Sequence, residues 1–328
     1  MKATAIAGSN IAFIKYRGNQ DDDLRIPMNG SISMTLDAAH TTTNVEFNPN
    51  LADDSFTLNG SHVNRKATAR VSKHLDHIRK IANSDLKAVV SSQNSFPTGA
   101  GIASSASGFA ALTVAASKAL RLDLTRSELG RIARLGSGSA CRSIDGGFVE
   151  WHPGGSHEDS YAVPIAPSDH WDLVDIVAII SSEHKAYGSS TGHALAHSSP
   201  FYKSRLGTVD DSLAQVRQAI LEKDFAALGR LIEEEAIQLH VTAMTSIPSV
   251  LYWQAGTLNV IHALRSWRKS DPSVAGYFTI DAGANVHIIS ERKSVPALLE
   301  NLKTVDGVEE MLVSHIGGEA RVIDGVTA

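Results

Sequence analysis

A glycine- and serine-rich stretch, residues 97–108, runs directly into an alanine-rich segment, residues 109–120, that is predicted to be a helix. Such a loop leaves backbone N–H groups unpaired at the start of a helix, where they and the helix dipole bind phosphate oxygens. The hydroxyls of Ser104, Ser105 and Ser107 can contact phosphates or a bound cation. The stretch has neither the P-loop ending nor the dinucleotide fingerprint, so a nucleotide would bind by another scheme. The alternative is a helix start built of small residues for close packing.

A second block, residues 136–143, alternates glycine and serine and then carries an arginine. Ser137, Ser139 and Arg142 combine short hydroxyl donors with a forked guanidinium, as a phosphate or carboxylate pocket requires. The alternative is a loop at a helix end, with Arg142 paired to a surface acid. Cys141 lies inside the block, but no base can be assigned to it, and we interpret it as a small buried residue.

Two further groups could carry charge into a site. Asp281 follows an expected strand and precedes small residues, so it could act as a base in a cleft, although the sequence alone favours an ordinary Asp-Gly turn. Lys15 and Arg17 follow the apolar segment 11–14 and indicate cations held near a site. A surface strand end would have a similar pattern.

Composition is typical of a globular enzyme. The chain has 328 residues, 43% of them hydrophobic, a formal net charge of -5 and one cysteine. Without a long basic run, nucleic acid and anionic membranes are not expected as partners. With no internal disulfide possible, and with neither a signal peptide nor a membrane span recognised, the expected location is the cytoplasm.

The predicted elements define an α+β protein with two lobes that meet near residues 165–170. Apolar alternation predicts strands at 44–47, 55–58, 86–91, 148–151, 277–281, 286–290 and 311–315, and the apolar run 173–181 predicts a buried strand. Helices are expected at 63–82, 109–120, 125–135, 211–222, 225–243, 258–269 and 295–302. The acidic runs 21–23 and 233–235 are interpreted as solvated faces.

The four blocks occur in an order that resembles the GHMP kinase superfamily and, within it, the ATP-dependent mevalonate diphosphate decarboxylases. The family pattern Asn-Ile-Ala-x-Ile-Lys-Tyr-Trp-Gly-Lys corresponds to residues 10–19, and Pro-x-Asn-Ser-Ser-Leu-Ser to residues 27–33. Its Gly-Ser-Gly-Ser-Ala-Cys-Arg-Ser block matches residues 136–143 fully, and its Asp-Ala-Gly-Pro-Asn block matches residues 281–285 apart from Ala284. Weaker matches to the family pattern are found at residues 189–192, His240 and residues 251–253.

The resemblance implies a two-lobed GHMP fold with the active site in the cleft between lobes. The N-terminal lobe, residues 1–168, would resemble ribosomal protein S5 and carry the phosphate loop. The C-terminal lobe, residues 169–328, would be ferredoxin-like and carry the catalytic aspartate. Family members are often homodimers, so a homodimer is expected.

The implied chemistry is phosphorylation, by ATP with Mg²⁺, of the tertiary 3-hydroxyl of a phosphorylated mevalonate, after which loss of that phosphate drives decarboxylation. By resemblance, the catalytic residues are Asp281 as base, Lys15 as a source of positive charge and Arg142, which holds the carboxylate or phosphoryl group. The substrate contacts are Tyr16, Arg17, Asn19, Ser137, Ser139, Arg142 and His193. The nucleotide contacts are Pro97, Gly99, Ala100, Gly101, Ser104, Ser105 and Ser107, with Ser104 and Ser105 also near the metal.

Three departures from the family pattern bear on the substrate. Asn19 replaces the lysine that lies by the diphosphate, Arg17 replaces a tryptophan, and His193 replaces a methionine. We interpret them as a shift from mevalonate 5-diphosphate to mevalonate 5-phosphate, which would make the product isopentenyl phosphate. The alternative is drift around an unchanged diphosphate site.

Activities of other classes are also considered. His193 and His197 have the spacing of two metal ligands on a helix, but no third ligand is evident for a zinc hydrolase. A mevalonate 3-kinase would need the phosphate loop but could dispense with Asp281. A decarboxylase that acts without ATP would not need the loop, and a non-catalytic binding protein would need none of the reactive blocks.

Overall fold

The computed structural model describes residues 1–96, 104–181 and 188–323. Its larger sheet is antiparallel except for one parallel pair, β5 with β7. The strand order is β14 (Arg321–Val322), β1 (Lys2–Ile14), β4 (Ser31–Asn48), β7 (Lys87–Asn94), β5 (Ser55–Leu58) and β6 (Ser61–His62), while β8 (Phe148–His152) joins β4 to β9 (Tyr161–Ala166). A smaller antiparallel sheet has the order β11 (Gly276–Thr279), β12 (Val286–Glu291), β10 (Leu173–Ile179), β13 (Glu310–His315). A short hairpin joins β2 (Asn19–Asp21) to β3 (Ile26–Pro27).

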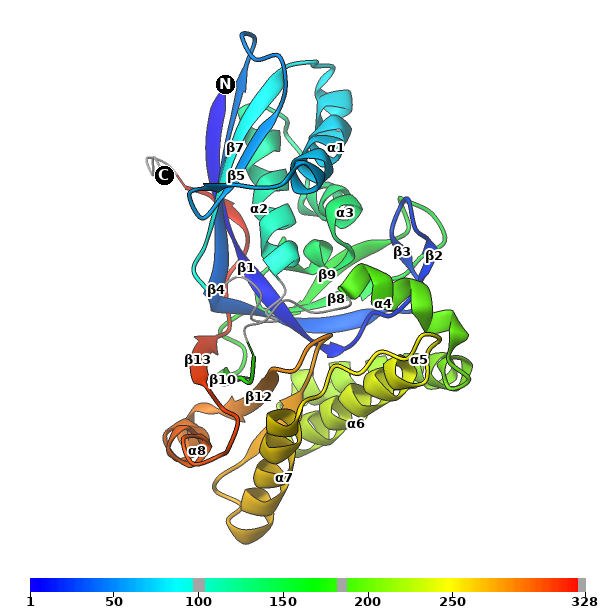
Figure 1. Ribbon diagram of the computed structural model, residues 1–328, viewed down its shortest axis with the longest axis vertical. Helices are drawn as coiled ribbons and strands as arrows, with labels where there is room; N and C mark the ends of the chain where they lie inside the picture. Colours follow the sequence, from blue (N-terminus) through cyan, green and yellow to red (C-terminus); the bar gives the residue numbers. More distant parts are fainter. Residues whose placement is uncertain (97–103, 182–187, 324–328) are drawn as a thin grey trace.

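Helices cover both sheets (Figure 1). The first group is α1 (Arg65–Ala82), α2 (Ser104–Ala119), α3 (Arg126–Gly136) and the 3₁₀ helix η1 (Gly138–Ser143). The second group is α4 (Ser189–Leu195), η2 (Ala196–Ser198), α5 (Tyr202–Glu222), α6 (Phe225–Met244), α7 (Ala255–Ser270), η3 (Arg292–Ser294) and α8 (Val295–Leu302). No helix among the described residues is both long and apolar enough to cross a membrane. Two antiparallel-rich sheets covered by helices confirm the predicted α+β class.

Three apolar cores hold these layers together. One lies between the larger sheet and α1, α2 and α3, and another lies beneath the smaller sheet against α7 and α8. The third is shared by β1, β4, β10, α5 and α6, and it joins the two sheets. Strand β1 serves two cores, since Ala5 and Ala7 face the first and Ile11 and Phe13 face the third.

Strand β1 was not predicted because the apolar side chains that its first half buries are the small ones of Ala5 and Ala7, which give a weak apolar signal. The β1–β4 register shifts between Gly8 and Asn10, and such a bulge moves the later side chains to the other side of the sheet. Ile11 and Phe13 therefore face another core although the alternation in the sequence continues. Strand β9 was also missed because it contains Pro164, which is tolerated there because β9 pairs with β8 alone.

Most other elements lie where they were predicted, and most differences concern their ends. Two are larger, since only residues 44–47 of β4 were predicted and α4 was not predicted. Helix α5 begins at Tyr202, nine residues before the expected start, and its N-cap Phe201 offers no side-chain capping bond. Helix α2 begins at Ser104 rather than at residue 109. Strand β11 ends at Thr279, so Asp281 lies beyond it. By contrast, α3 begins where the helix at 125–135 was predicted, and Thr125 and Glu128 form a capping box there.

The acidic run 233–235 is not the solvated face that was predicted. Glu233 is 7% exposed and Glu235 is 3% exposed, while Glu234 between them lies on the surface. Glu233 pairs with Arg268 at 2.8 Å, and Glu235 pairs with Arg205. These arginines lie 35 and 30 residues away along the chain, so a local charge pattern could not reveal the pairs.

Candidate active site

Lys15 and Asp281 form the centre of the site. Lys15 follows the last residue of β1 and Asp281 follows β11, so the two sheets bring together residues that are 266 positions apart. Lys15 Nζ donates to Asp281 Oδ1 at 2.6 Å. The lysine side chain is 3% exposed and the aspartate side chain 27%. The carboxylate therefore retains a face that a substrate can reach.

The backbone of Lys15 is held on both sides by a buried ion pair. Its N–H donates to Glu235 Oε1 at 2.9 Å, and its carbonyl accepts from Arg205 Nη2 at 2.7 Å. Glu235 on α6 and Arg205 on α5 also bond directly to each other. Asn29 Nδ2 donates to the same carbonyl at 2.9 Å. Two helices thus fix the position from which the Lys15 ammonium reaches Asp281.

Arg142, on η1, is a buried cation held by neutral groups. It donates from Nη1 to Ser31 Oγ at 2.6 Å, from Nε to Ser33 Oγ at 3.0 Å and from Nη2 to Asn10 Oδ1 at 3.2 Å. Burial lowers the pKa of Arg142, and the charge of Asp281 is among those that oppose this effect. The alternative of a surface arginine paired to an acid is wrong, because Arg142 is 2% exposed and has no ion pair in the described chain. A buried guanidinium without a carboxylate attracts an anionic ligand.

The neighbouring Cys141 is 1% exposed, and its Sγ donates to the Gly138 carbonyl. Burial raises the pKa of the Cys141 thiol to about 12. The thiol is therefore protonated at neutral pH, which agrees with its interpretation as a small buried residue.

Three predicted substrate contacts, Tyr16, Asn19 and His193, lie together near Arg142. The Tyr16 hydroxyl donates to Asn19 Oδ1 at 2.6 Å, and the rings of Tyr16 and His193 stack with 4.0 Å between centroids. The Gly18 N–H donates to His193 Nδ1 at 3.1 Å. Burial first, and then the charge of Arg17, lower the pKa of His193 to about 3. The imidazole is thus neutral, and its proton lies on Nε2, where it can be donated.

His193 and His197 do not form the start of a zinc site. Nδ1 of His193 accepts from Gly18, whereas the ring of His197 packs edge-on against Tyr202. Within the described ranges, no three His, Cys, Asp or Glu side chains gather as metal ligands.

Arg17 is buried beneath α4. It is 2% exposed, and its Nε and Nη2 atoms have no hydrogen-bond partner among the described residues. A Cβ at Gly192 would overlap Arg17 Nη1, so a larger residue at that position of α4 would displace the guanidinium. Burial lowers the pKa of Arg17. Arg17 is thus an interior cation between β1 and α4, and the alternative of a surface strand end is wrong.

The serines of the two glycine-rich blocks meet. Ser105 Oγ on α2 lies 3.0 Å from Ser137 Oγ, which links the expected nucleotide end to the expected substrate end. The Ser139 carbonyl accepts from Asn10 Nδ2 at 3.2 Å. Ser107 is placed differently, since it is fully buried and its Oγ lies 2.7 Å from Thr41 Oγ1 in the sheet. The structure therefore gives Ser107 a packing position and offers no support for its predicted contact with ATP. Pro97, Gly99, Ala100 and Gly101 lie outside the described residues.

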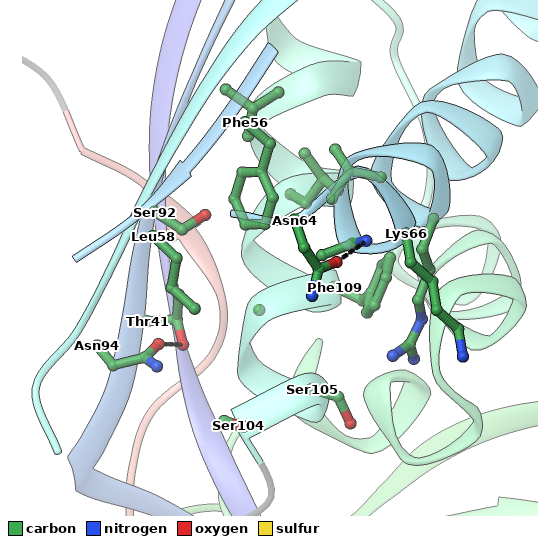
Figure 2. Close-up of a pocket in the computed structure, with 16 residues that line it drawn as sticks. Thr41, Phe56, Leu58, Asn64, Lys66, Ser92, Asn94, Ser104, Ser105 and Phe109 are labelled. Atoms are coloured by element: carbon green, nitrogen blue, oxygen red, sulfur yellow. Dashed lines mark hydrogen bonds between the residues drawn. The ribbon is translucent and has the colours of Figure 1, made fainter. Parts of the chain in front are cut away.

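A pocket of about 380 Å³ opens beside the start of α2 (Figure 2). Phe56 and Leu58 of β5 form an apolar wall opposite Phe109, and Ser104 and Ser105 lie at one end. Other lining residues are Thr41, Asn64, Lys66, Ala67, Arg70, Val71, Val90, Ser92, Asn94, Gly108 and Leu112. Apolar walls with cations and a helix start at one end are suited to a flat base that carries phosphates.

Of the residues that line this pocket, sequence reasoning identified Ser104 and Ser105 but not the others. The one available signal was the lysine and arginine content of the helix predicted at 63–82, which contributes Lys66 and Arg70 to the pocket. Phe56 and Leu58 had no signal beyond an ordinary strand pattern.

The sequence of this chain matches two domains of one known protein family. Residues 7–162 match the diphosphomevalonate decarboxylase-like N-terminal domain, and residues 175–322 match the mevalonate 5-diphosphate decarboxylase C-terminal domain. The phosphomevalonate decarboxylase of Haloferax volcanii is 34% identical over 99% of this chain and 98% of its own length. The human diphosphomevalonate decarboxylase is 34% identical over 88% of this chain and 76% of its own.

Solved structures show the same likeness. The mevalonate diphosphate decarboxylase of Staphylococcus aureus is 41% identical, with a TM-score of 0.94 over 98% of both chains. The complex of MDDEF with MVAPP, AMPPCP and magnesium is 39% identical, with a TM-score of 0.93 over 99% of both chains.

The fold and the site define an enzyme with the GHMP kinase architecture. The chain belongs to the mevalonate diphosphate decarboxylase family, as the order of its four sequence blocks predicted.

Proposed function

We propose that the protein uses ATP to phosphorylate the 3-hydroxyl of mevalonate 5-phosphate and then decarboxylates the product to isopentenyl phosphate. The observation that carries this proposal is the Lys15–Asp281 pair at 2.6 Å beside Arg142. Arg142 is a buried cation whose hydrogen-bond partners are neutral side chains. A base and a buried cation side by side suit a substrate that carries both a hydroxyl and a carboxylate. The named relatives, which are phosphomevalonate and diphosphomevalonate decarboxylases, support the reaction class.

The residues divide the work in a simple way. Asp281 accepts the proton of the 3-hydroxyl as its oxygen takes the phosphoryl group, and the Lys15 ammonium stabilises the carboxylate and the developing charge. Arg142 binds the substrate carboxylate until the C–C bond breaks. The electron pair of that bond then forms the new C=C bond, the C3–O bond breaks as phosphate leaves, and CO₂ is released.

The nucleotide belongs in the pocket of Figure 2, with the apolar walls around its base and Ser104, Ser105, Lys66 and Arg70 toward its phosphates. Bound ATP with Mg²⁺ supplies the phosphoryl group and neutralises part of its charge. The hydroxyls of Ser104 and Ser105 fit phosphate or metal contacts, since both lie at the first turn of α2. The Ser105–Ser137 contact brings this end close to the substrate residues.

Asn19 supports a monophosphate rather than a diphosphate. Its oxygen accepts from Tyr16, and its nitrogen donates to Asp22 Oδ1 at 2.6 Å. Residue 19, where the family has a lysine, is therefore uncharged, and its side chain is hydrogen-bonded to the Asp22 carboxylate. A second phosphate, which adds negative charge, would face no cation from residue 19. The neutral His193 offers one hydrogen bond and no charge.

The first experiment measures ADP and CO₂ release with ATP, Mg²⁺ and either mevalonate 5-phosphate or mevalonate 5-diphosphate. We expect a kcat/KM at least about 10-fold higher for the monophosphate, equivalent to about 1.4 kcal/mol of discrimination, and equal amounts of ADP and CO₂. Preference for the diphosphate would return the protein to the diphosphomevalonate decarboxylase activity. ADP without CO₂ would indicate a mevalonate 3-kinase.

Three broader expectations stay predictions. They are the homodimer, the cytoplasmic location and the division into lobes at residues 168 and 169. The chain passes from the larger sheet to the smaller one between β9 and β10, that is, between residues 166 and 173.

A further inference from the structure

The tip of the β2–β3 hairpin is fastened to the end of α3. Arg25 Nε donates to the Leu135 carbonyl at 3.0 Å, and Arg134 Nε donates back to the Leu24 carbonyl at 3.1 Å. Arg25 has a φ of 51°, in the left-handed region that residues with a Cβ rarely adopt. The hairpin thus holds Arg25 at one place, against the segment that leads into Ser137.

Arg134 and Arg25 differ in how many of their guanidinium N–H groups have hydrogen-bond partners. Arg134 is fully buried; its Nη1 donates to the Ser160 carbonyl and its Nη2 contacts His157. Arg25 is half-buried, and neither of its Nη atoms has a hydrogen bond or an ion pair with any described residue. Arg134 is therefore a structural residue, whereas Arg25 keeps two donor groups for a ligand.

The charge of Arg25 acts on residues of the proposed substrate site and on Arg70. Burial raises the pKa of Tyr16, and the charge of Arg25 is the strongest effect in the opposite direction. The same charge acts on His193. Arg70, whose Nη2 donates to the Gly136 carbonyl at 2.8 Å, has its pKa lowered to about 10 by burial first and then by Arg25. Neither Arg25 nor Arg70 has a carboxylate within ion-pair distance in the described ranges.

We propose that Arg25 binds the 5-phosphoryl group of the substrate with its two Nη groups, which have no partner among the described residues. Two neighbouring guanidiniums without an acid are balanced by an anion, and a fork of N–H donors matches phosphate oxygens. Arg70 lines the nucleotide pocket, whereas Arg25 lies toward Tyr16 and His193. Arg25 was not among the residues that the sequence indicated.

The test compares Arg25→Gln with wild type in steady-state kinetics. This inference rests on the proposed function, so wild type is first assayed with both phosphorylated mevalonates and the better substrate is then used throughout. We expect Arg25→Gln to raise the KM for that substrate about 10- to 100-fold, while the KM for ATP stays within about threefold. Calorimetric binding of the same substrate without nucleotide should weaken by a similar factor.

Two further variants complete the design. Arg25→Lys keeps the charge but loses the fork, so its KM should lie between those of wild type and Arg25→Gln. Arg131→Gln is the matched control, since Arg131 donates to a backbone carbonyl, that of Glu158, on the exposed side of α3. Its kinetics should equal those of wild type.

The outcomes separate the two proposals. An unchanged substrate KM in folded Arg25 variants, with melting temperatures near that of wild type, would overturn the role of Arg25 whichever substrate is preferred. A rise confined to the KM for ATP would assign Arg25 to the nucleotide and would also overturn it. A wild-type preference for the diphosphate would overturn the proposed substrate, and Arg25 would still be tested with that substrate.

Discussion

The charged side chains of the site differ in what balances them. The Lys15 ammonium has Asp281 as its partner, whereas the Arg142 guanidinium is surrounded by hydroxyls and an amide. Two nitrogens of Arg17 have no hydrogen-bond partner in the part of the chain that the structure describes. A buried cation without an anion is costly. An anionic substrate offsets that cost when it binds, so the substrate itself completes the electrostatics of the site.

At the same scale, Asp281 should be required for turnover. Asp281→Asn keeps the size of the side chain but removes the base, so we expect kcat to fall about 10²- to 10⁴-fold while the substrate KM changes only a few-fold. Coupled measurement of ADP release gives both constants. Asp172→Asn, at an exposed aspartate paired with Arg292, is the control and should retain wild-type kcat. Normal turnover by Asp281→Asn would remove the aspartate from the mechanism.

At the scale of elements, two helices determine where β1 ends. Glu235 on α6 and Arg205 on α5 hold the backbone of Lys15, and both side chains are almost fully buried. The Lys15 ammonium is thus positioned by contacts to the main chain of its own residue. This arrangement ties the stability of the α5–α6 pair to the geometry of the site.

Removing Glu235 should therefore be severe. Glu235→Ala leaves Arg205 buried without its partner, and we expect the free energy of unfolding to fall by about 3–5 kcal/mol. The neighbouring Glu234 forms an exposed pair with Arg230, so Glu234→Ala should cost no more than about 1 kcal/mol. Urea unfolding of the two variants makes the comparison. Equal losses would mean that the buried pair does not anchor this part of the fold.

Local patterns in the sequence identified most elements and the blocks that meet at the site. They predicted α1, α3, α6 and α8 closely, because each has a clear apolar face or cap. They failed where the determinant lies elsewhere in the chain, as for the distant arginines that pair with the buried Glu233 and Glu235. Arg25 was missed for the same reason, because its contact with the Leu135 carbonyl joins residues 110 positions apart and has no local sequence signal.

At the scale of the whole molecule, the site lies where the two sheets are joined by a shared core (Figure 1). Each sheet contributes one member of the central pair, Lys15 or Asp281, so an intact interface is a condition for catalysis. Anything that loosens the packing of the whole fold will therefore reduce activity as well as stability. Protonation of buried groups is one such cause.

Acid should destabilise the fold through its buried imidazoles. His74 is 2% exposed and contacts Thr113 Oγ1 at 2.8 Å, and burial is the main cause that lowers its pKa to about 3. Between pH 6.5 and about 3, the unfolded chain binds a proton at this residue and the folded chain does not, so stability falls as pH falls. The slope is about 1.4 kcal/mol per pH unit, or about 2 kcal/mol between pH 6.5 and 5.

His74→Gln retains a polar partner for Thr113 but cannot take up the proton. The variant should be less stable at pH 7 because a packed ring is lost, yet it should lose about 2 kcal/mol less than wild type between pH 7 and pH 5. Urea unfolding at the two pH values measures the difference, with the exposed His62→Gln on β6 as the control. An equal acid loss in His74→Gln and wild type would show that the acid sensitivity arises from other groups, of which His240, 1% exposed with a pKa that burial first lowers to about 3, would be examined next.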